Sequence, residues 1–181
     1  MTERMDLDDV TVVRRVRGGE VELFRVLVER YRGEFGRYAV AMVDGDVDTA
    51  QDAMQEAFIR AFESLASCRD PSRFKAWFFR ILKNQCHNAR SRTRRQVPLN
   101  GVEAEAGSGA DSELKRGELQ GAIEAALEAL TPEQREAFVM KHIEGRSYAE
   151  MAELLDTGED ALKMRVYRAR DELKRRLEDL R

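Results

Sequence analysis

The sequence predicts an all-α protein made of two small helical domains that are joined by a flexible acidic linker. Three observations favour this fold class. Apolar residues recur at helical spacing through most of the chain, and no segment sustains a period-two alternation. A stretch short of large apolar residues divides the helical parts. The predicted boundaries are residues 1–95 for the first domain, 96–117 for the linker and 118–181 for the second domain.

Four helices are expected in the first domain. A short helix around residues 10–16 ends at the glycine pair 18–19. A long helix follows over residues 24–42, where seven apolar side chains keep a helical period. A third apolar stripe covers residues 50–65 after DGDVD. The fourth stripe starts at Phe74 and runs into the basic stretch NARSRTRR, and Trp77 falls on the stripe, which favours a place in the core.

The linker and the start of the second domain differ sharply in composition. Residues 96–117, QVPLNGVEAEAGSGADSELKRG, cannot bury enough apolar surface to offset the entropy of ordering them. The second domain then has clear helix starts. Thr131-Pro132 with Gln134, and Ser147 with Glu150, are capping-box signatures.

A helix that begins at Ser147, a turn at Asp156-Thr157-Gly158 and a second helix are typical of a helix-turn-helix, whose second helix enters the DNA major groove. The second helix carries its own apolar stripe of Leu162, Val166, Ala169, Leu173 and Leu177. This stretch alone leaves open a solvated helical hairpin with ordinary surface charge. The residues predicted to face outward, and hence DNA, are Lys163, Met164, Arg165, Tyr167 and Arg168.

Charge is strongly segregated along the chain, although the formal net charge is only -3. Residues 69–95 hold nine Lys or Arg and one acid, residues 99–130 hold seven acids and two bases, and residues 163–176 hold seven bases and two acids. Two basic stretches separated by an acidic one indicate two contacts with a polyanion.

Hydropathy and the spacing of the cysteines and histidines disfavour several function classes. No apolar run approaches the roughly 20 residues that span a bilayer, and the acidic N-terminus lacks a signal segment, so a cytoplasmic protein without stable membrane insertion is expected. Cys68, Cys86, His87 and His142 show no metal-ligand or triad spacing. We therefore expect no catalytic residue, no metal and no cofactor, and the protein is predicted not to be an enzyme.

Three stretches in a fixed order resemble the extracytoplasmic-function (ECF) sigma factors of bacterial RNA polymerase, in the sigma-70 superfamily. The stretch DAMQEAFIRAFESL (52–65) is similar to the part of region 2 that binds the clamp helices of the largest polymerase subunit. The stretch FKAWFFRILKNQCHNARSR (74–92) resembles the helix that reads and opens the minus-ten element. Residues 130–173 resemble region 4, which reads the minus-thirty-five element.

The resemblance implies an alternative sigma factor that binds core RNA polymerase and promoter DNA and has an anti-sigma factor as a further partner. It assigns polymerase contacts to Asp52, Gln55, Glu56 and Arg60. The minus-thirty-five contacts are the five outward residues of the second helix named above. The minus-ten contacts are Arg73, Lys75, Arg80, Lys83, Asn84, His87, Asn88 and Arg90.

The turn of the helix-turn-helix departs from the family pattern of glycine, an aliphatic residue and serine. Asp156-Thr157-Gly158 stands there instead, and Glu159 and Asp160 follow at the helix N-terminus, where carboxylates stabilise the helix dipole but repel phosphate. A stand-alone helix-turn-helix regulator is the alternative function. It explains residues 130–173 but leaves the basic segment 69–95 and the stretch 52–65 unused.

Overall fold

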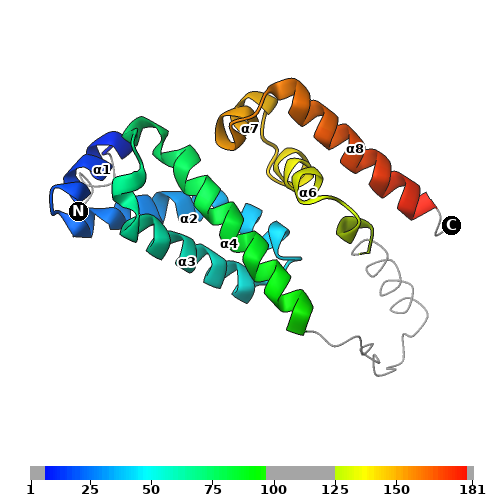
Figure 1. The fold of residues 1–181 in the computed structure, drawn as a ribbon, viewed down its shortest axis with the longest axis horizontal. Coiled ribbons are helices and arrows are strands. Elements are labelled where there is room, and N and C mark those ends of the chain that lie inside the picture. The colour runs from blue at the N-terminus through cyan, green and yellow to red at the C-terminus, as the bar shows by residue number, and fades with distance from the viewer. Residues whose placement is uncertain (1–6, 97–124, 179–181) are drawn as a thin grey trace.

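Every regular element in the described part of the chain, residues 7–96 and 125–178 of the computed structural model, is helical (Figure 1). This confirms the predicted all-α class. The predicted linker lies, apart from Gln96, outside the described residues, and so does the second domain up to residue 124. We refer to residues 7–96 as the N-terminal bundle and to residues 125–178 as the C-terminal module.

Capping side chains and a glycine turn set the ends of helices in the N-terminal bundle. The Asp8 carboxylate accepts a hydrogen bond from the Thr11 N–H at 2.8 Å and caps the first helix. The Asp46 carboxylate does the same for the third helix through the Thr49 N–H at 3.1 Å. Gly19, with φ of +107°, turns the chain after the first helix. The helices are α1 (Asp9–Arg17), α2 (Phe24–Met42), α3 (Val47–Glu63) and α4 (Phe74–Gln96), with 3₁₀ turns at Val21–Leu23, Leu65–Ser67 and Pro71–Arg73.

An aromatic cluster holds α2, α3 and α4 together. The Phe78 ring of α4 is fully buried and stacks on Phe58 of α3, with 4.6 Å between ring centroids. The same ring lies 5.6 Å from Tyr31 and 6.2 Å from Phe35, both on α2. Trp77 is partly buried against this core, as predicted. The outward face of α4 is therefore fixed by aromatic packing on its inward face.

Both predicted capping boxes are present in the C-terminal module. The Thr131 hydroxyl accepts a hydrogen bond from the Gln134 N–H at 3.2 Å, and the Gln134 side chain accepts one from the Thr131 N–H at 3.0 Å. Ser147 and Glu150 form the equivalent pair. The elements of the module are α6 (Pro132–Phe138), a π-helical segment (Val139–Ile143), α7 (Tyr148–Leu155) and α8 (Glu159–Glu178), preceded by helical residues 125–128.

The π-helical segment was not predicted. It widens the end of α6, and Gly145 then adopts a left-handed φ of +70°. The Arg146 N–H donates back to the Met140 carbonyl at 3.0 Å. The wide turn thus sets the Arg146 side chain at the border with the N-terminal bundle.

The C-terminal module packs directly on the N-terminal bundle. Figure 1 shows α7 beside α4. The π-helical segment contacts α2. The buried apolar cluster runs without a break from Phe35 and Phe79 into Val139, Met140 and Met151. The two groups of helices, which stand on either side of residues 97–124 in the sequence, therefore share one core.

Candidate nucleic-acid and polymerase interfaces

The turn between α7 and α8 is built without glycine at its strained position. Asp156 ends α7 with φ of +51° and ψ of +49°, a left-handed conformation that Asp tolerates better than most residues. The Leu162 N–H donates to the Gly158 carbonyl at 3.2 Å, so α8 starts directly after Gly158. The atypical turn therefore still produces a helix-turn-helix.

The two faces of α8 separate as the sequence predicts. Leu162, Val166 and Ala169 are buried, whereas Leu173 and Leu177 at the far end are only half-buried. Of the five candidate residues for minus-thirty-five contacts, Arg165 is half-buried and the other four, Lys163, Met164, Tyr167 and Arg168, are exposed.

One cation of α8, Lys163, is paired with a carboxylate of the same helix. The Lys163 ammonium donates to the Asp160 carboxylate at 3.0 Å, and this hydrogen bond raises the Lys163 pKa. DNA phosphate must therefore compete with Asp160 for Lys163. Both side chains are well exposed, so the competition is screened by solvent and salt.

One face of α4 presents polar side chains to solvent. Arg80, Asn84 and His87 are all exposed and follow one another at helical spacing, and Asn88 is exposed beside them. A basic and amide-lined helix face of this kind can hold a phosphate backbone and present donors and acceptors to unpaired bases.

The remaining four candidates for minus-ten contacts lie elsewhere around α4, and each has a carboxylate partner. Arg73 pairs with Asp156 at 3.4 Å, Lys75 with Glu34 at 2.7 Å, Lys83 with Glu136 at 3.3 Å, and Arg90 with Asp44 at 2.8 Å. The structure therefore divides the eight predicted residues into an open group and an ion-paired group.

The four candidates for polymerase contacts line one open groove of about 820 Å³ between α3 and the second half of α4. Asp52, Gln55 and Arg60 are exposed, and the Glu56 carboxylate pairs with the Arg60 guanidinium at 2.7 Å. Asn88 and Arg92 of α4 form the opposite wall. The sequence-predicted residues thus belong to a single concave surface of mixed charge.

Comparison with known proteins identifies both groups of helices. Residues 27–96 match the family described as Sigma-70 region 2, and residues 120–173 match Sigma-70, region 4. The ECF RNA polymerase sigma-E factor of Escherichia coli (strain K12) is 30% identical over 187 residues, which cover 96% of this chain and 96% of that relative. The chain belongs to the ECF RNA polymerase sigma factors.

Further relatives agree with this assignment. The ECF RNA polymerase sigma-E factor of Haemophilus influenzae is 27% identical over 186 residues, covering 96% of this chain and 97% of that protein. The solved structure of CnrH in complex with the cytosolic domain of CnrY is similar with a TM-score of 0.63 and 25% identity, over 94% of this chain and 97% of CnrH. The chain is an alternative sigma factor that directs transcription initiation by RNA polymerase, and a stand-alone regulator would leave the region 2 match unexplained.

Three charged residues of this ECF sigma factor are buried, and their burial was not predicted from the sequence. Arg135, Glu136 and Arg146 of the C-terminal module are 2%, 5% and 9% exposed. Burial raises the Glu136 pKa and lowers the Arg135 pKa, because desolvation disfavours the charged form of each. A helical pattern alone places charged residues on the surface, so the sequence carried no signal that these three are buried.

An apolar hollow was also missed. It has a volume of about 510 Å³ and lies between α2 and α3, on the other side of Gln55 from the groove between α3 and α4. Val47 and Ile59 on its rim are 52% and 44% exposed. Both residues lie outside the apolar stripe of α3. The sequence signal for this hollow was therefore the presence of large apolar residues on the outward face of the helix.

The two cysteines are buried in the structure, and the described residues contain neither a metal-ligating cluster nor a membrane-spanning helix. Cys68 and Cys86 are both buried, and desolvation raises the Cys86 pKa to about 12. Among residues 7–96 and 125–178, no group of three or more His, Cys, Asp or Glu could hold a metal ion. Within the same ranges, no helix is long and apolar enough to cross a membrane.

Proposed function

We propose that this ECF sigma factor divides its work between the two helical groups, with domain limits at residues 1–95, 96–117 and 118–181. The N-terminal bundle binds the clamp helices of the largest polymerase subunit and captures the minus-ten strand. The C-terminal module reads the minus-thirty-five duplex. The observation that carries the proposal is that an exposed polar helix face in a region 2 match and an exposed basic helix in a region 4 match occur on one chain.

Polymerase contact is assigned to the groove beside α3, through Asp52, Gln55, Glu56 and Arg60. These side chains are accessible without moving the core, because the helix packs through Ala53, Met54 and Ala57 on its other face. The chemistry of RNA synthesis then belongs to the polymerase, and this chain supplies position and sequence selection.

The minus-ten contacts are assigned first to Arg80, Asn84, His87 and Asn88, which are exposed as the chain stands. Arg73, Lys75, Lys83 and Arg90 add positive charge once their carboxylate partners give way. On α8, Lys163, Met164, Tyr167 and Arg168 face the major groove, with half-buried Arg165 at its edge. Phosphate contacts supply affinity here and base-edge contacts supply sequence selection.

The decisive experiment measures co-purification with core polymerase. We expect the unmodified chain to bind core at near one-to-one, and the double variant Gln55→Ala/Glu56→Ala to bind much more weakly while keeping its helical circular dichroism. The matched control is Arg25→Ala/Glu29→Ala, which removes an exposed pair on α2 whose N–O separation is 3.5 Å. Equal binding by both double variants would show that the assigned surface is wrong.

An anti-sigma factor is proposed as a further partner, and the cytoplasm as the place of action. The support is the likeness to CnrH, which was solved in complex with the cytosolic domain of CnrY. A protein partner isolated by pull-down with the full chain should compete with core polymerase for binding, if both use the same surface of this chain. Simultaneous binding of core and that partner would contradict the assignment.

A further inference from the structure

We propose that Arg17 of α1 is a positioning residue for minus-ten recognition, because its guanidinium fixes the shape of the loop that joins α3 to α4. Residues 64–73 are called the α3–α4 loop. This role rests on the proposed function of α4 and Arg73 in minus-ten binding, and it gives a task to α1. Arg17 acts through the loop and not by touching DNA.

The α3–α4 loop presents polar side chains directly before α4. Four of them are exposed: Ser67, Arg69, Ser72 and Arg73. Hydroxyl and guanidinium groups of this kind bind phosphate oxygens and the edges of unpaired bases. A serine side chain is too short to correct for a displaced backbone, so the shape of the loop decides what its hydroxyl groups can reach.

One nitrogen of Arg17 bridges two carbonyl groups of the loop. The Arg17 Nη2 donates to the Leu65 carbonyl at 2.6 Å and also to the Cys68 carbonyl. These carbonyls stand on either side of the exposed pair Ala66-Ser67, so the shared donor holds this turn closed. Two carbonyl oxygens brought together repel each other, and a cationic donor between them forms stronger hydrogen bonds than a neutral one.

The hydrogen bonds inside the loop are short-range. The Ser67 N–H donates to the Ser64 carbonyl at 2.8 Å, and the Asp70 carboxylate accepts from the Ser72 N–H at 2.9 Å. These bonds shape each 3₁₀ turn separately. Arg17, 48 and 51 positions away from its two acceptors, is what ties the loop backbone to another helix. Burial anchors the Leu65 and Cys68 side chains, and the bonds from Arg17 set the direction of their carbonyls.

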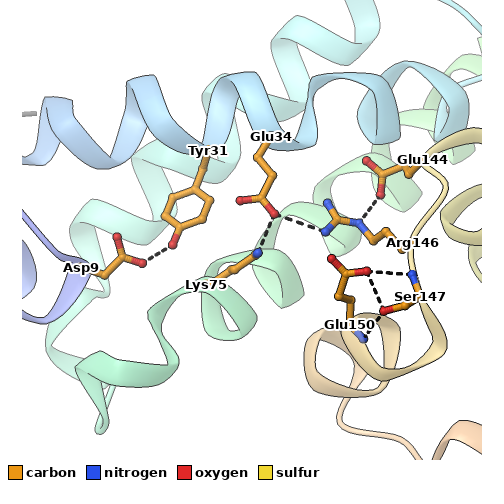
Figure 2. A network of polar contacts seen from close by, with 8 residues as sticks. All are labelled: Asp9, Tyr31, Glu34, Lys75, Glu144, Arg146, Ser147 and Glu150. Carbon is orange, nitrogen blue, oxygen red and sulfur yellow. Dashed lines mark hydrogen bonds and ion pairs between the residues drawn. The ribbon is translucent and has the colours of Figure 1, made fainter. Parts of the chain in front are cut away.

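The helix that carries Arg17 is itself held firmly on the bundle. Figure 2 shows the Asp9 carboxylate, in the first turn of α1, accepting a hydrogen bond from the Tyr31 hydroxyl of α2. Burial raises the Tyr31 pKa, so this hydroxyl stays protonated and remains a donor. At the other end of α1, the Arg15 Nε donates to the Glu20 carboxylate at 2.8 Å. The guanidinium of Arg17 therefore starts from a fixed helix.

The start of α4 is fixed without Arg17. Lys75, in the first turn of α4, pairs with Glu34 of α2 at 2.7 Å, as Figure 2 shows. Phe74 beside it is fully buried. Loss of the Arg17 side chain should therefore release the loop between two helices that stay in place, and should not unfold the bundle.

The first measurement is amide hydrogen exchange of the full chain, read by mass spectrometry of its peptides. The variant is Arg17→Ala, and the conservative variant is Arg17→Lys, whose ammonium can still donate to two carbonyls. The matched control is Arg14→Ala, which removes an exposed cation from the same helix. We expect Arg17→Ala to speed exchange in residues 64–73 by roughly tenfold, the loss typical of a hydrogen bond to a charged group. Peptides from α2 should keep the parent rate.

The second measurement is base selection by the complex of the full chain with core polymerase. The probe is a pool of single-stranded DNA oligonucleotides of random sequence, and the bound fraction is sequenced. We expect Arg17→Ala to lose base enrichment by roughly tenfold at one end of the selected motif, the discrimination that one good base contact supplies. The parent, Arg17→Lys and Arg14→Ala should select the same bases. A merely stabilising role for Arg17 would lower total binding and leave the base profile unchanged.

The two measurements separate this role from the proposed function. Unchanged loop exchange in Arg17→Ala, or a base profile equal to that of the parent, would overturn the role of Arg17. An equal loss of selection in Arg14→Ala would also overturn it, since charge alone would then explain the effect. Absence of base enrichment in the parent would contradict the proposed function of α4, and hydrogen exchange would still decide whether Arg17 holds the loop.

Discussion

Truncation of Phe78 should remove much of the stability of the N-terminal bundle. The Phe78 side chain is fully buried and lies within 6.2 Å, centroid to centroid, of Tyr31, Phe35, Phe58 and Phe74. Phe78→Ala loses the transfer free energy of the ring and leaves a cavity among rigid rings that cannot collapse into it. Substitutions of this kind cost about 3–5 kcal/mol, a large share of the roughly 5–15 kcal/mol that stabilises a typical domain.

Trp77, the single tryptophan of the chain, makes this prediction easy to measure. It lies on α4 with its ring 5.6 Å from Phe74, so its fluorescence reports unfolding of the N-terminal bundle. With a urea dependence of about 2 kcal/mol per molar, the midpoint should fall by roughly 1.5–2.5 M. The matched control is Phe62→Ala, because Phe62 is 43% exposed and contacts Phe24 at the edge of the bundle. The reasoning fails if Phe78→Ala unfolds at the parent midpoint or if Phe62→Ala costs as much.

Three further predictions concern the C-terminal module and the thiols. Asp156→Val should lower the free energy of unfolding by about 1–2 kcal/mol, because a β-branched residue is strained at φ of +51°, whereas Asp156→Gly should cause no loss; thermal unfolding checks both. Arg168→Ala should weaken minus-thirty-five binding by about 10- to 100-fold in a gel shift with core polymerase, while Lys174→Ala, the same charge loss nearer the end of α8, should leave sequence selection unchanged. Cys68 and Cys86 should resist alkylation at pH 8 in the native chain and react at once in denaturant, because burial raises both pKa values and keeps the thiols protonated; fast labelling of the folded chain would contradict this.

The local structure of this sigma factor could be predicted from the sequence because its signals act over three or four residues. The capping boxes at Thr131 and Ser147 are formed by side chains that reach only to Gln134 and Glu150, so their presence follows from residue type and spacing. The same holds for the inward face of α8 around Val166.

The choice of candidate DNA-contacting residues was predictable only in part. Helical spacing places Arg80, Asn84 and His87 on one face of α4, and the structure has them exposed together. Lys83 and Arg90 look equivalent in sequence, but Lys83 pairs with Glu136 of the C-terminal module and Arg90 pairs with Asp44 in the turn after α2. No periodicity argument can distinguish the two groups, since the distinction depends on what packs against the helix.

The sequence by itself determined the helices, their inward faces, the two-part organisation and the family, because each depends on short-range order or on motifs in a fixed succession. Only the tertiary structure decided that Arg135, Glu136 and Arg146 are buried. Their partners Asp44, Tyr38 and Glu34 lie 91, 98 and 112 positions away. A charged side chain is stable inside a protein only where a partner of opposite sign or a hydrogen-bonding group meets it, and the packing of one helical group on the other supplies those partners.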